Sequence, residues 1–206
     1  VDMSTNQIFI VDDDDAIRDA LGWLFRSRGH VARLWSSAEA LIAGGEIGRC
    51  GCLLLDIRMD GMSGLELFEW LRENGHDIPV IFLTGHGDVP MAVAALKKGA
   101  FDFVEKPFND NELVARALAA LDIHHQRSSR QAAAREVDER LAQLTSRELE
   151  VMERVLAGQM NKVIAMDLGV TMRTVEVHRA RIFDKMGVRS AVELAQLLTA
   201  RTPKPD

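Results

Sequence analysis

The chain has 206 residues, of which 47% are hydrophobic and 27% are charged, the balance of a globular protein rather than a disordered one. No apolar run approaches the roughly 18 residues that a membrane span needs, and two cysteines are too few for a disulfide scaffold. These features exclude the membrane, secreted and fibrous classes and predict a cytoplasmic protein.

Acidic and basic side chains are unevenly distributed along the chain. Residues 1–122 carry 20 acidic and 11 basic side chains (a net −9), whereas residues 123–206 carry 11 acidic and 14 basic side chains (a net +3). We therefore expect two domains with different partners, and the basic excess of the second favours a polyanion.

Apolar runs alternate with helix-like segments in the first half. We expect strands at residues 8–11, 31–34, 52–55, 80–83 and 103–105, and helices at 15–28, 37–43, 65–72, 89–98 and 111–121. This alternation predicts an α/β fold with a five-stranded, doubly wound parallel sheet. Sheets of this kind place their ligand site at the carboxyl ends of the strands.

Polar side chains follow four of these strands. Asp12 and Asp13 come after the first strand, Asp56 after the third, Thr84 after the fourth and Lys106 after the fifth. Because parallel strands end at a shared edge, these side chains should converge on one crevice. Carboxylates there suit Mg²⁺, and a carboxylate near a bound cation can attack a phosphoryl group. The Lys106 ammonium and the Thr84 hydroxyl would then bind the phosphate.

The segment 122–143 is polar, rich in helix formers and free of Gly and Pro, which predicts a helical linker that extends the preceding helix. A break near Ser128 is left open. Val137, Leu141 and Leu144 follow a 4,3 spacing that would suit pairing of two chains, although barely two heptads are present. A solvated spacer helix fits this segment equally well.

The last 60 or so residues have the signals of four short helices, expected at residues 146–157, 161–168, 171–186 and 191–198. Thr145 with Glu148, and Ser190 with Glu193, have the spacing of capping boxes. Gly169 and the residue after it form the tight turn of a helix-turn-helix between the middle pair.

A helical projection of residues 171–186 separates an apolar face from a polar one. The apolar face, expected to pack in the core, consists of Val175, Ile182 and Met186. The opposite face, expected to meet a groove, consists of Arg173, Glu176, Val177, Ala180, Arg181 and Asp184. His178 is expected to be half buried, and the fourth helix is expected to bury Val192, Leu194 and Ala195.

Residues 8–121 resemble the receiver domain of two-component response regulators, which has a flavodoxin-like fold. The resemblance rests on Val11-Asp12-Asp13, Leu55-Asp56, Thr84 and Lys106-Pro107-Phe108, and the stretch from Leu83 to Val93 is similar to that of the FixJ-like subgroup. It implies phosphate transfer from the phosphohistidine of a sensor histidine kinase. The implied site residues are Asp56 as phosphoacceptor; Asp12, Asp13, Asp56 and the backbone carbonyl of Arg58 for Mg²⁺; and Thr84, Phe103 and Lys106 for phosphate binding and switching.

The resemblance also implies a cis bond between Lys106 and Pro107. One position departs from the family pattern: Asp60 stands four residues after Asp56, where the family usually has proline. We expect phosphorylation chemistry to survive, with an extra negative charge near the phosphate and a looser loop. Asp14 and Asp15 are expected to cap the first helix, where acidic side chains suit the helix dipole, rather than to bind metal.

Residues 144–198 resemble the LuxR/NarL-type DNA-binding domain in the segments Leu144 to Met152, Asn161 to Ala165, Thr174 to His178 and Lys185 to Val188. In that family the fourth helix forms the dimer contact on DNA. The resemblance implies base reading by Glu176, Val177 and Ala180, and phosphate contacts from Asn161, Lys162, Arg173, Thr174, Arg179 and Lys185. A glutamate accepts hydrogen bonds from cytosine amino groups, and valine contacts thymine methyl groups.

The sequence thus predicts a two-component response regulator of the FixJ/NarL type, with a receiver at 1–121, a linker at 122–143 and a DNA-binding domain at 144–206. It would catalyse only its own aspartyl phosphorylation and dephosphorylation. The expected partners are a sensor histidine kinase, double-stranded promoter DNA and a second copy upon phosphorylation, with RNA polymerase as a further candidate. Two rival hypotheses are a phosphotransfer protein whose helical tail binds proteins, and a constitutive DNA-binding dimer held by the linker helix.

Overall fold

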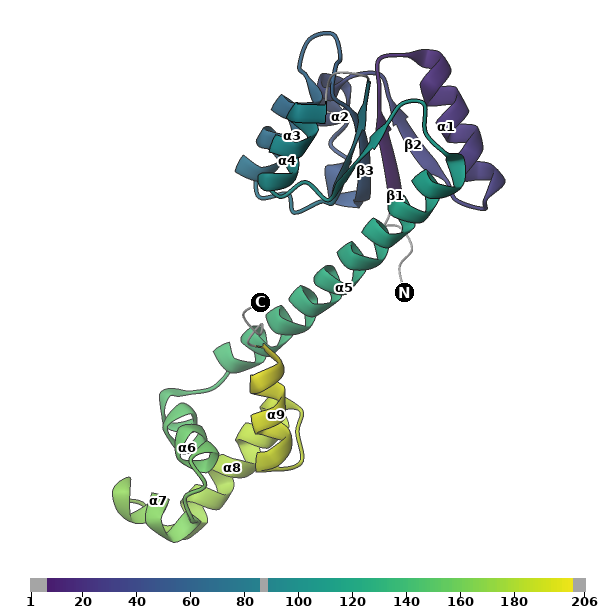
Figure 1. The fold of residues 1–206 in the computed structure, drawn as a ribbon. Helices are drawn as coiled ribbons and strands as arrows, with labels where there is room; N and C mark the ends of the chain where they lie inside the picture. The colour runs from purple at the N-terminus through teal and green to yellow at the C-terminus, as the bar shows by residue number, and fades with distance from the viewer. Residues whose placement is uncertain (1–6, 86–88, 202–206) are drawn as a thin grey trace. The chain divides into compact units, whose positions relative to one another are not determined.

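The computed structural model describes residues 7–85 and 89–201. The chain divides into two compact units, residues 1–127 and 128–206, and the division falls inside the long helix α5 (Asp110–Ala142) (Figure 1). Within the described part of the chain, no helix is long and apolar enough to cross a membrane.

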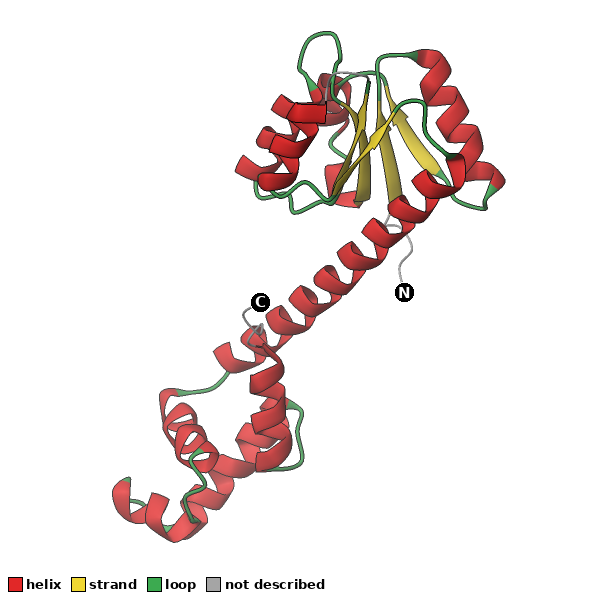
Figure 2. Cartoon of the chain, in the orientation of Figure 1, coloured by secondary structure: helices red, strands yellow, loops and turns green. Residues whose placement is uncertain are grey.

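The first unit is built on a parallel sheet in the order β2-β1-β3-β4-β5. Its strands are β1 (Gln7–Val11), β2 (Ala32–Trp35), β3 (Cys50–Asp56), β4 (Val80–Thr84) and β5 (Asp102–Glu105). The non-consecutive strand order arises from helical crossovers, and Figure 2 shows the sheet between two helical layers. The expected doubly wound α/β fold is confirmed.

Helices cover the two faces of this sheet. The helices other than α5 are α1 (Asp15–Ser27), α2 (Ala38–Gly44), α3 (Gly64–Glu73) and α4 (Val89–Lys97), with a short 3₁₀ helix η2 (Ile47–Arg49) before β3. Buried side chains of α2, α3 and α4 pack on one face, and those of α1 and α5 pack on the other. The 3₁₀ turn is an addition to the predicted elements.

Alternation along the strands divides the core between these two faces. In β3, Leu53 and Leu55 lie in one cluster and Cys52 and Leu54 in the other, because successive side chains of a strand point to opposite sides. All seven residues of β3 are buried, as expected for the central strand of a sheet covered on both faces. Cys50 and Cys52 are buried free thiols that pack in the two core clusters.

The second unit is a cluster of helices around one apolar core. It contains α6 (Ser146–Leu156), α7 (Asn161–Asp167), α8 (Met172–Met186) and α9 (Ala191–Arg201). Gly169, with φ of +63°, makes the turn between α7 and α8. The expected core residues Val175, Ile182 and Met186 are buried, which confirms the projection of α8.

Helix α5 decides two points that the sequence left open. The helix is unbroken at Ser128. Val137 and Leu144, which had the spacing of a seam between two chains, are only 6% and 7% exposed and pack inside the second unit's own core, with Leu141 against it. Burial within the same chain removes these side chains from a coiled-coil seam, so the hypothesis of a constitutive dimer through them is not favoured.

Helix α9 corrects an expectation. Leu194 is buried, but Val192 is 67% exposed and Ala195 is also exposed. The inward stripe runs through Leu194, Leu197 and Leu198, at spacings of three and four residues. On a helix with 3.6 residues per turn, Val192 therefore lies off this stripe.

Candidate functional site

Four strand ends bring the predicted crevice together. Asp12 follows β1, Asp56 ends β3, Thr84 ends β4 and Lys106 follows β5. Asp12 is 1% exposed and Thr84 is fully buried, while Asp56 is buried except for its edge. The parallel register, with Val11 beside Leu55, aligns the ends of β1 and β3 and puts their carboxylates at one edge.

Lys106 bridges two of the carboxylates. Its Nζ donates to Asp12 Oδ2 at 2.8 Å and to Asp56 Oδ1 at 2.6 Å. Its backbone N–H donates to the Thr84 carbonyl at 2.7 Å, and the bond to Pro107 is cis, as the resemblance implied. The parallel pairing of β5 with β4 and this backbone bond thus place the Lys106 ammonium beside the carboxylates of Asp12 and Asp56.

Electrostatics at Asp56 favour its neutral form more than at an ordinary carboxyl. Burial raises the pKa of Asp56, hydrogen bonding and charge attraction from Lys106 oppose this rise, and the neighbouring Asp12 carboxylate adds to it. Burial works against the charged form of Lys106, but its bonds to Asp12 and Asp56 outweigh that effect and raise the pKa of its ammonium. Shifted pKa values in a strand-end crevice are typical of functional groups.

Thr84 adds a polar group without a partner. Its hydroxyl oxygen is buried and finds no hydrogen-bond partner among the described residues. Buried hydroxyls are normally paired, so this one is available to an incoming oxygen at the strand end that adjoins Asp56. Phe103 pairs with Phe82 in the register of β5 with β4, and its ring is partly buried against the core cluster beneath α3 and α4.

The chemistry of the acidic residues fits a divalent cation. Asp12, Asp13 and Asp56 supply hard carboxylate oxygens. The Lys106 ammonium pairs with Asp12 and Asp56, and its one positive charge leaves the three carboxylates with an excess of two negative charges. Among the residues that the structure describes, no three His, Cys, Asp or Glu side chains already surround one ion position. The Lys106 ammonium lies between Asp12 and Asp56 instead.

Several supporting residues were missed by the sequence analysis. Gly64 lies so close to the Asp56 carbonyl that a Cβ there would collide with it. Arg18 Nη1 donates to the Asp12 carbonyl at 2.6 Å, and Glu39 Oε1 accepts from the Met62 backbone N–H at 2.8 Å. Only the position of Gly64 had a sequence signal, because the capping box of α3 begins at the residue before it.

Two expected caps are present. Asp14 is the N-cap of α1, and its carboxylate accepts from the backbone N–H of Ala16 at 2.8 Å, as predicted. Thr145 and Glu148 form the predicted capping box of α6. Asp88 immediately precedes α4, where an aspartate can cap a helix, and it lies outside the described residues.

The predicted base-reading residues share the outer face of α8. Glu176, Val177 and Ala180 are all exposed there. Arg173 is exposed beside them and pairs with Glu176 at 3.3 Å. This face is therefore free of packing within the second unit and is available to a groove.

The predicted phosphate contacts have more varied surroundings. Lys162 is exposed, and Thr174 Oγ1 lies 2.9 Å from the hydroxyl of Thr171 at the start of α8. Arg179 Nη1 donates to Asn161 Oδ1 at 3.2 Å, and its guanidinium lies 5.5 Å from the centre of the Phe183 ring. Arg179 therefore lies along the flank of the core, against the Phe183 ring.

Lys185 and His178 are partly buried, unlike the exposed Lys162. Lys185 Nζ donates to Glu148 at 2.7 Å and to the Gln143 carbonyl at 3.0 Å. This hydrogen bond from Lys185, together with those from Thr145, lowers the pKa of the buried Glu148 to about 2. His178 is half buried, as expected, and its Nδ1 has no partner among the described residues.

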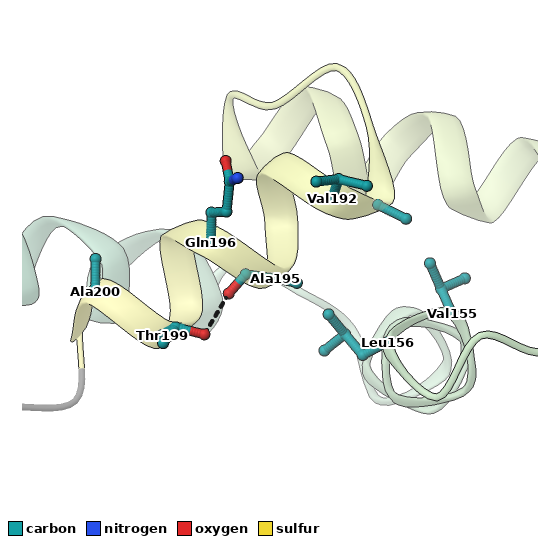
Figure 3. Close-up of a pocket in the computed structure, with 8 residues that line it drawn as sticks. Val155, Leu156, Val192, Ala195, Gln196, Thr199 and Ala200 are labelled. Carbon is teal, nitrogen blue, oxygen red and sulfur yellow. Dashed lines mark hydrogen bonds between the residues drawn. The ribbon is translucent and has the colours of Figure 1, made fainter.

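An apolar groove lies between α6 and α9 in the second unit. Its volume is about 670 Å³. Figure 3 shows Val192 and Ala195 of α9 facing this groove across from Leu156 of α6. Val192 and Ala195, which α9 leaves unburied, thus line one largely apolar groove.

The parallel sheet with its aspartate and lysine cluster, joined to a helix-turn-helix unit, defines a signal receiver coupled to a DNA-binding domain. Residues 8–118 match the family described as response regulator receiver domain, and residues 142–198 match the luxR family of bacterial regulatory proteins. The chain belongs to the FixJ/NarL family of two-component response regulators.

Relatives and solved structures agree with this assignment over nearly the whole chain. The C4-dicarboxylate transport transcriptional regulatory protein DctR of Rhodobacter capsulatus is 53% identical, with 92% of this chain and 98% of DctR covered. FixJ of Azorhizobium caulinodans is 43% identical, with 97% and 95% covered. The response regulator StyR matches with a TM-score of 0.89 at 37% identity, over 95% of this chain and 98% of StyR. Full-length FixJ from B. japonicum matches with a TM-score of 0.59 at 38% identity, over 95% and 96%.

The protein is therefore a transcriptional response regulator whose DNA binding depends on phosphorylation. Its family is regulatory rather than catalytic. The match to the luxR family also overturns the rival hypothesis of a protein-binding helical tail, because that tail is a DNA-binding domain.

Proposed function

We propose that Asp56 is the phosphoacceptor of this regulator and that the phosphohistidine of a sensor kinase is the donor. The observation that supports this proposal is the buried Asp56 carboxylate, 2.6 Å from the Lys106 ammonium and beside Asp12. In the transfer, an Asp56 oxygen bonds to phosphorus while the bond from phosphorus to the kinase nitrogen breaks, and the nitrogen keeps the electron pair. Hydrolysis of the acyl phosphate returns the carboxylate, so the chain's own chemistry is limited to gaining and losing this group.

Mg²⁺ is the proposed cofactor, held by Asp12, Asp13, Asp56 and the backbone carbonyl of Arg58. When bound, it supplies positive charge to the phosphoryl oxygens during transfer. The excess of two negative charges among these carboxylates and Lys106 is the balance that a divalent cation would restore.

Phosphorylation would rearrange the contacts of Lys106 and Thr84. The phosphoryl group adds up to about two negative charges, and the Lys106 ammonium, already beside Asp56, would pair with it. The unpartnered Thr84 hydroxyl would donate to a phosphoryl oxygen. Movement of Thr84 would leave room for the partly buried Phe103 ring to turn inward, and the surface of α4 and β5 would change with it.

On DNA, we assign base reading to Glu176, Val177 and Ala180. The exposed face of α8 supports this assignment. The proposed phosphate contacts are Asn161, Lys162, Arg173, Thr174 and Arg179. Lys185 would reach a phosphate only by leaving Glu148, so we assign it to holding α8 against α6 instead.

A homodimer would place two α8 helices on paired half-sites and raise affinity through effective concentration. The apolar groove between α6 and α9 supports α9 as the contact between copies on DNA, since exposed apolar patches mark interaction surfaces. RNA polymerase remains a candidate partner, and promoter binding would place the protein in the cytoplasm. We retain the functional division into receiver (1–121), linker (122–143) and DNA-binding domain (144–206).

Light scattering on the full chain, with and without Mg²⁺ and beryllofluoride, tests the phosphoacceptor. We expect the unsubstituted chain to change from monomer to dimer and to bind duplex DNA more tightly, because beryllofluoride mimics the phosphoryl group on Asp56. Asp56→Asn should show neither response, whereas Glu73→Gln, which removes an exposed carboxylate of α3, should show both. A full response by Asp56→Asn would refute the assignment, and a dimer under both conditions would refute phosphorylation-dependent dimerisation.

A further inference from the structure

Backbone N–H groups hold the loop between β3 and α3, residues 57–63, to itself and to its surroundings. Gly64 N donates to the Ile57 carbonyl at 3.0 Å and closes the loop on itself. Met62 N donates to Glu39 Oε1 at 2.8 Å. Asp60 N donates to Asp13 Oδ2 at 2.9 Å, which ties the loop to the acidic crevice.

Each of the three carboxylates of the crevice accepts a hydrogen bond from a backbone N–H group, but the donor to Asp13 is distant in the sequence. Asp12 Oδ1 accepts from the backbone N–H of Asp14 at 3.0 Å, and Asp56 Oδ2 accepts from that of Arg58 at 2.9 Å. Each of these donors is two residues further along the chain, so the contact is local. Asp13 receives its backbone N–H from Asp60, which is 47 residues away.

Asp13 also differs from Asp12 and Asp56 in how far its side chain is exposed. Asp12 and Asp56 are buried and bound to Lys106, whereas the Asp13 side chain is exposed. An exposed carboxylate loses rotamer freedom when it binds a cation, and a contact that orients it beforehand reduces that loss. The bond from Asp60 occupies one oxygen of Asp13 and restrains the other.

We propose that Asp60 is a positioning residue, whose backbone N–H orients the Asp13 carboxylate and so strengthens Mg²⁺ binding. This inference rests on the proposed magnesium site and deepens it. A proline at position 60 has no N–H and could not make the bond. Asp60, which departs from the family pattern, thus links the loop 57–63 to Asp13 of the crevice. The sequence had instead led us to expect a looser loop.

Calorimetric titration of the full chain with Mg²⁺ alone measures this effect. Asp60→Pro should weaken binding about tenfold, the size expected for one hydrogen bond to a charged group. Asp60→Ala removes the side-chain carboxylate but keeps the N–H, so its change should be much smaller. Equal dissociation constants for the two variants would overturn the positioning role.

Amide hydrogen exchange tests the contact without introducing proline. Asp13→Ala should remove the protection of the Asp60 amide and leave that of Met62, while Glu39→Ala should do the reverse, because each substitution removes one acceptor. An Asp60 amide that stays protected in Asp13→Ala would refute the tie, even if Asp60→Pro failed to fold.

The two measurements separate this inference from the proposed function. If the unsubstituted chain binds no Mg²⁺, the magnesium site fails and the positioning role fails with it. If Mg²⁺ binds and Asp60→Pro matches Asp60→Ala, only the positioning role fails.

Discussion

At the scale of single residues, two ion pairs with a buried carboxylate show how similar contacts serve different ends. Asp56 faces Lys106 but also the Asp12 carboxylate, and burial raises its pKa. Glu148 faces Lys185 and accepts two further hydrogen bonds from Thr145, so its pKa falls to about 2. At Asp56, burial and a neighbouring carboxylate disfavour the charged form, which is typical of a reactive group. At Glu148, the hydrogen bond from Lys185 holds α8 against α6.

Glu148 should therefore make the second unit's stability depend on pH. The pKa of Glu148 is lowered from 4.5 to about 2 in the folded protein. Ionised Glu148 therefore stabilises the fold fully above pH 4.5, and this stabilisation is lost as the pH falls from 4.5 toward 2. At neutral pH we expect Glu148→Gln to lower the free energy of unfolding by about 2 kcal/mol, since it leaves Lys185 without its buried partner.

Thermal unfolding followed by circular dichroism across this pH range measures the effect. The melting temperature of Glu148→Gln should lie below that of the unsubstituted chain, and this gap should narrow as the pH falls from 4.5 toward 2. Glu153→Gln, which changes an exposed carboxylate of the same helix, should have little effect. A difference that stays constant with pH would contradict this account of the ion pair.

At the scale of elements, the end of α5 is part of the DNA-binding unit rather than a free spacer. Val137 and Leu144 pack into that unit's core. Arg140 Nη1 donates to the Met186 carbonyl at 2.8 Å, which satisfies a carbonyl at the C-terminal end of α8. The last turns of α5 therefore contact the helix that carries the predicted base-reading residues.

Val137→Ala tests this role of α5. Loss of two buried methyl groups should lower the free energy of unfolding of the second unit by about 2 kcal/mol. Hydrogen exchange of buried α8 amides such as Ile182 would report the change, with Arg135→Ala on the exposed side of α5 as the control. The monomer mass should be unaltered, and dissociation of a dimer by Val137→Ala would instead support a coiled-coil seam.

At the scale of the whole molecule, the two units carry opposite charge. The first unit, residues 1–127, has 20 acidic against 12 basic side chains, and the second, residues 128–206, has 11 against 13. An acidic receiver is repelled by duplex DNA, so attraction to the phosphate backbone must come from the second unit.

Salt dependence of DNA binding measures this attraction. The logarithm of the association constant should fall linearly with the logarithm of salt concentration. Lys162→Ala should weaken binding to any duplex and reduce the slope by about one, because it removes one phosphate contact. Arg135→Ala, on the exposed face of α5, is the matched control, and an unchanged slope in Lys162→Ala would refute the contact.

The sequence by itself determined the elements and the crevice, because both follow from local patterns. Apolar runs and helical spacing located the strands and helices, and parallel strands necessarily bring Asp12, Asp56, Thr84 and Lys106 to one edge. The inward face of α8 followed from its 3.6-residue period in the same way. These predictions needed no knowledge of which distant side chains meet.

Only the tertiary structure decided which partners those residues have. The bond from Asp60 to Asp13 spans 47 positions, and that from Lys185 to Glu148 spans 37. The same 4,3 spacing of Val137, Leu141 and Leu144 suits a seam between chains or a core within one, and the packing of α6 to α9 selected the core. Periodicity shows which face of a helix is apolar, but the surface that covers this face depends on how the whole chain is packed.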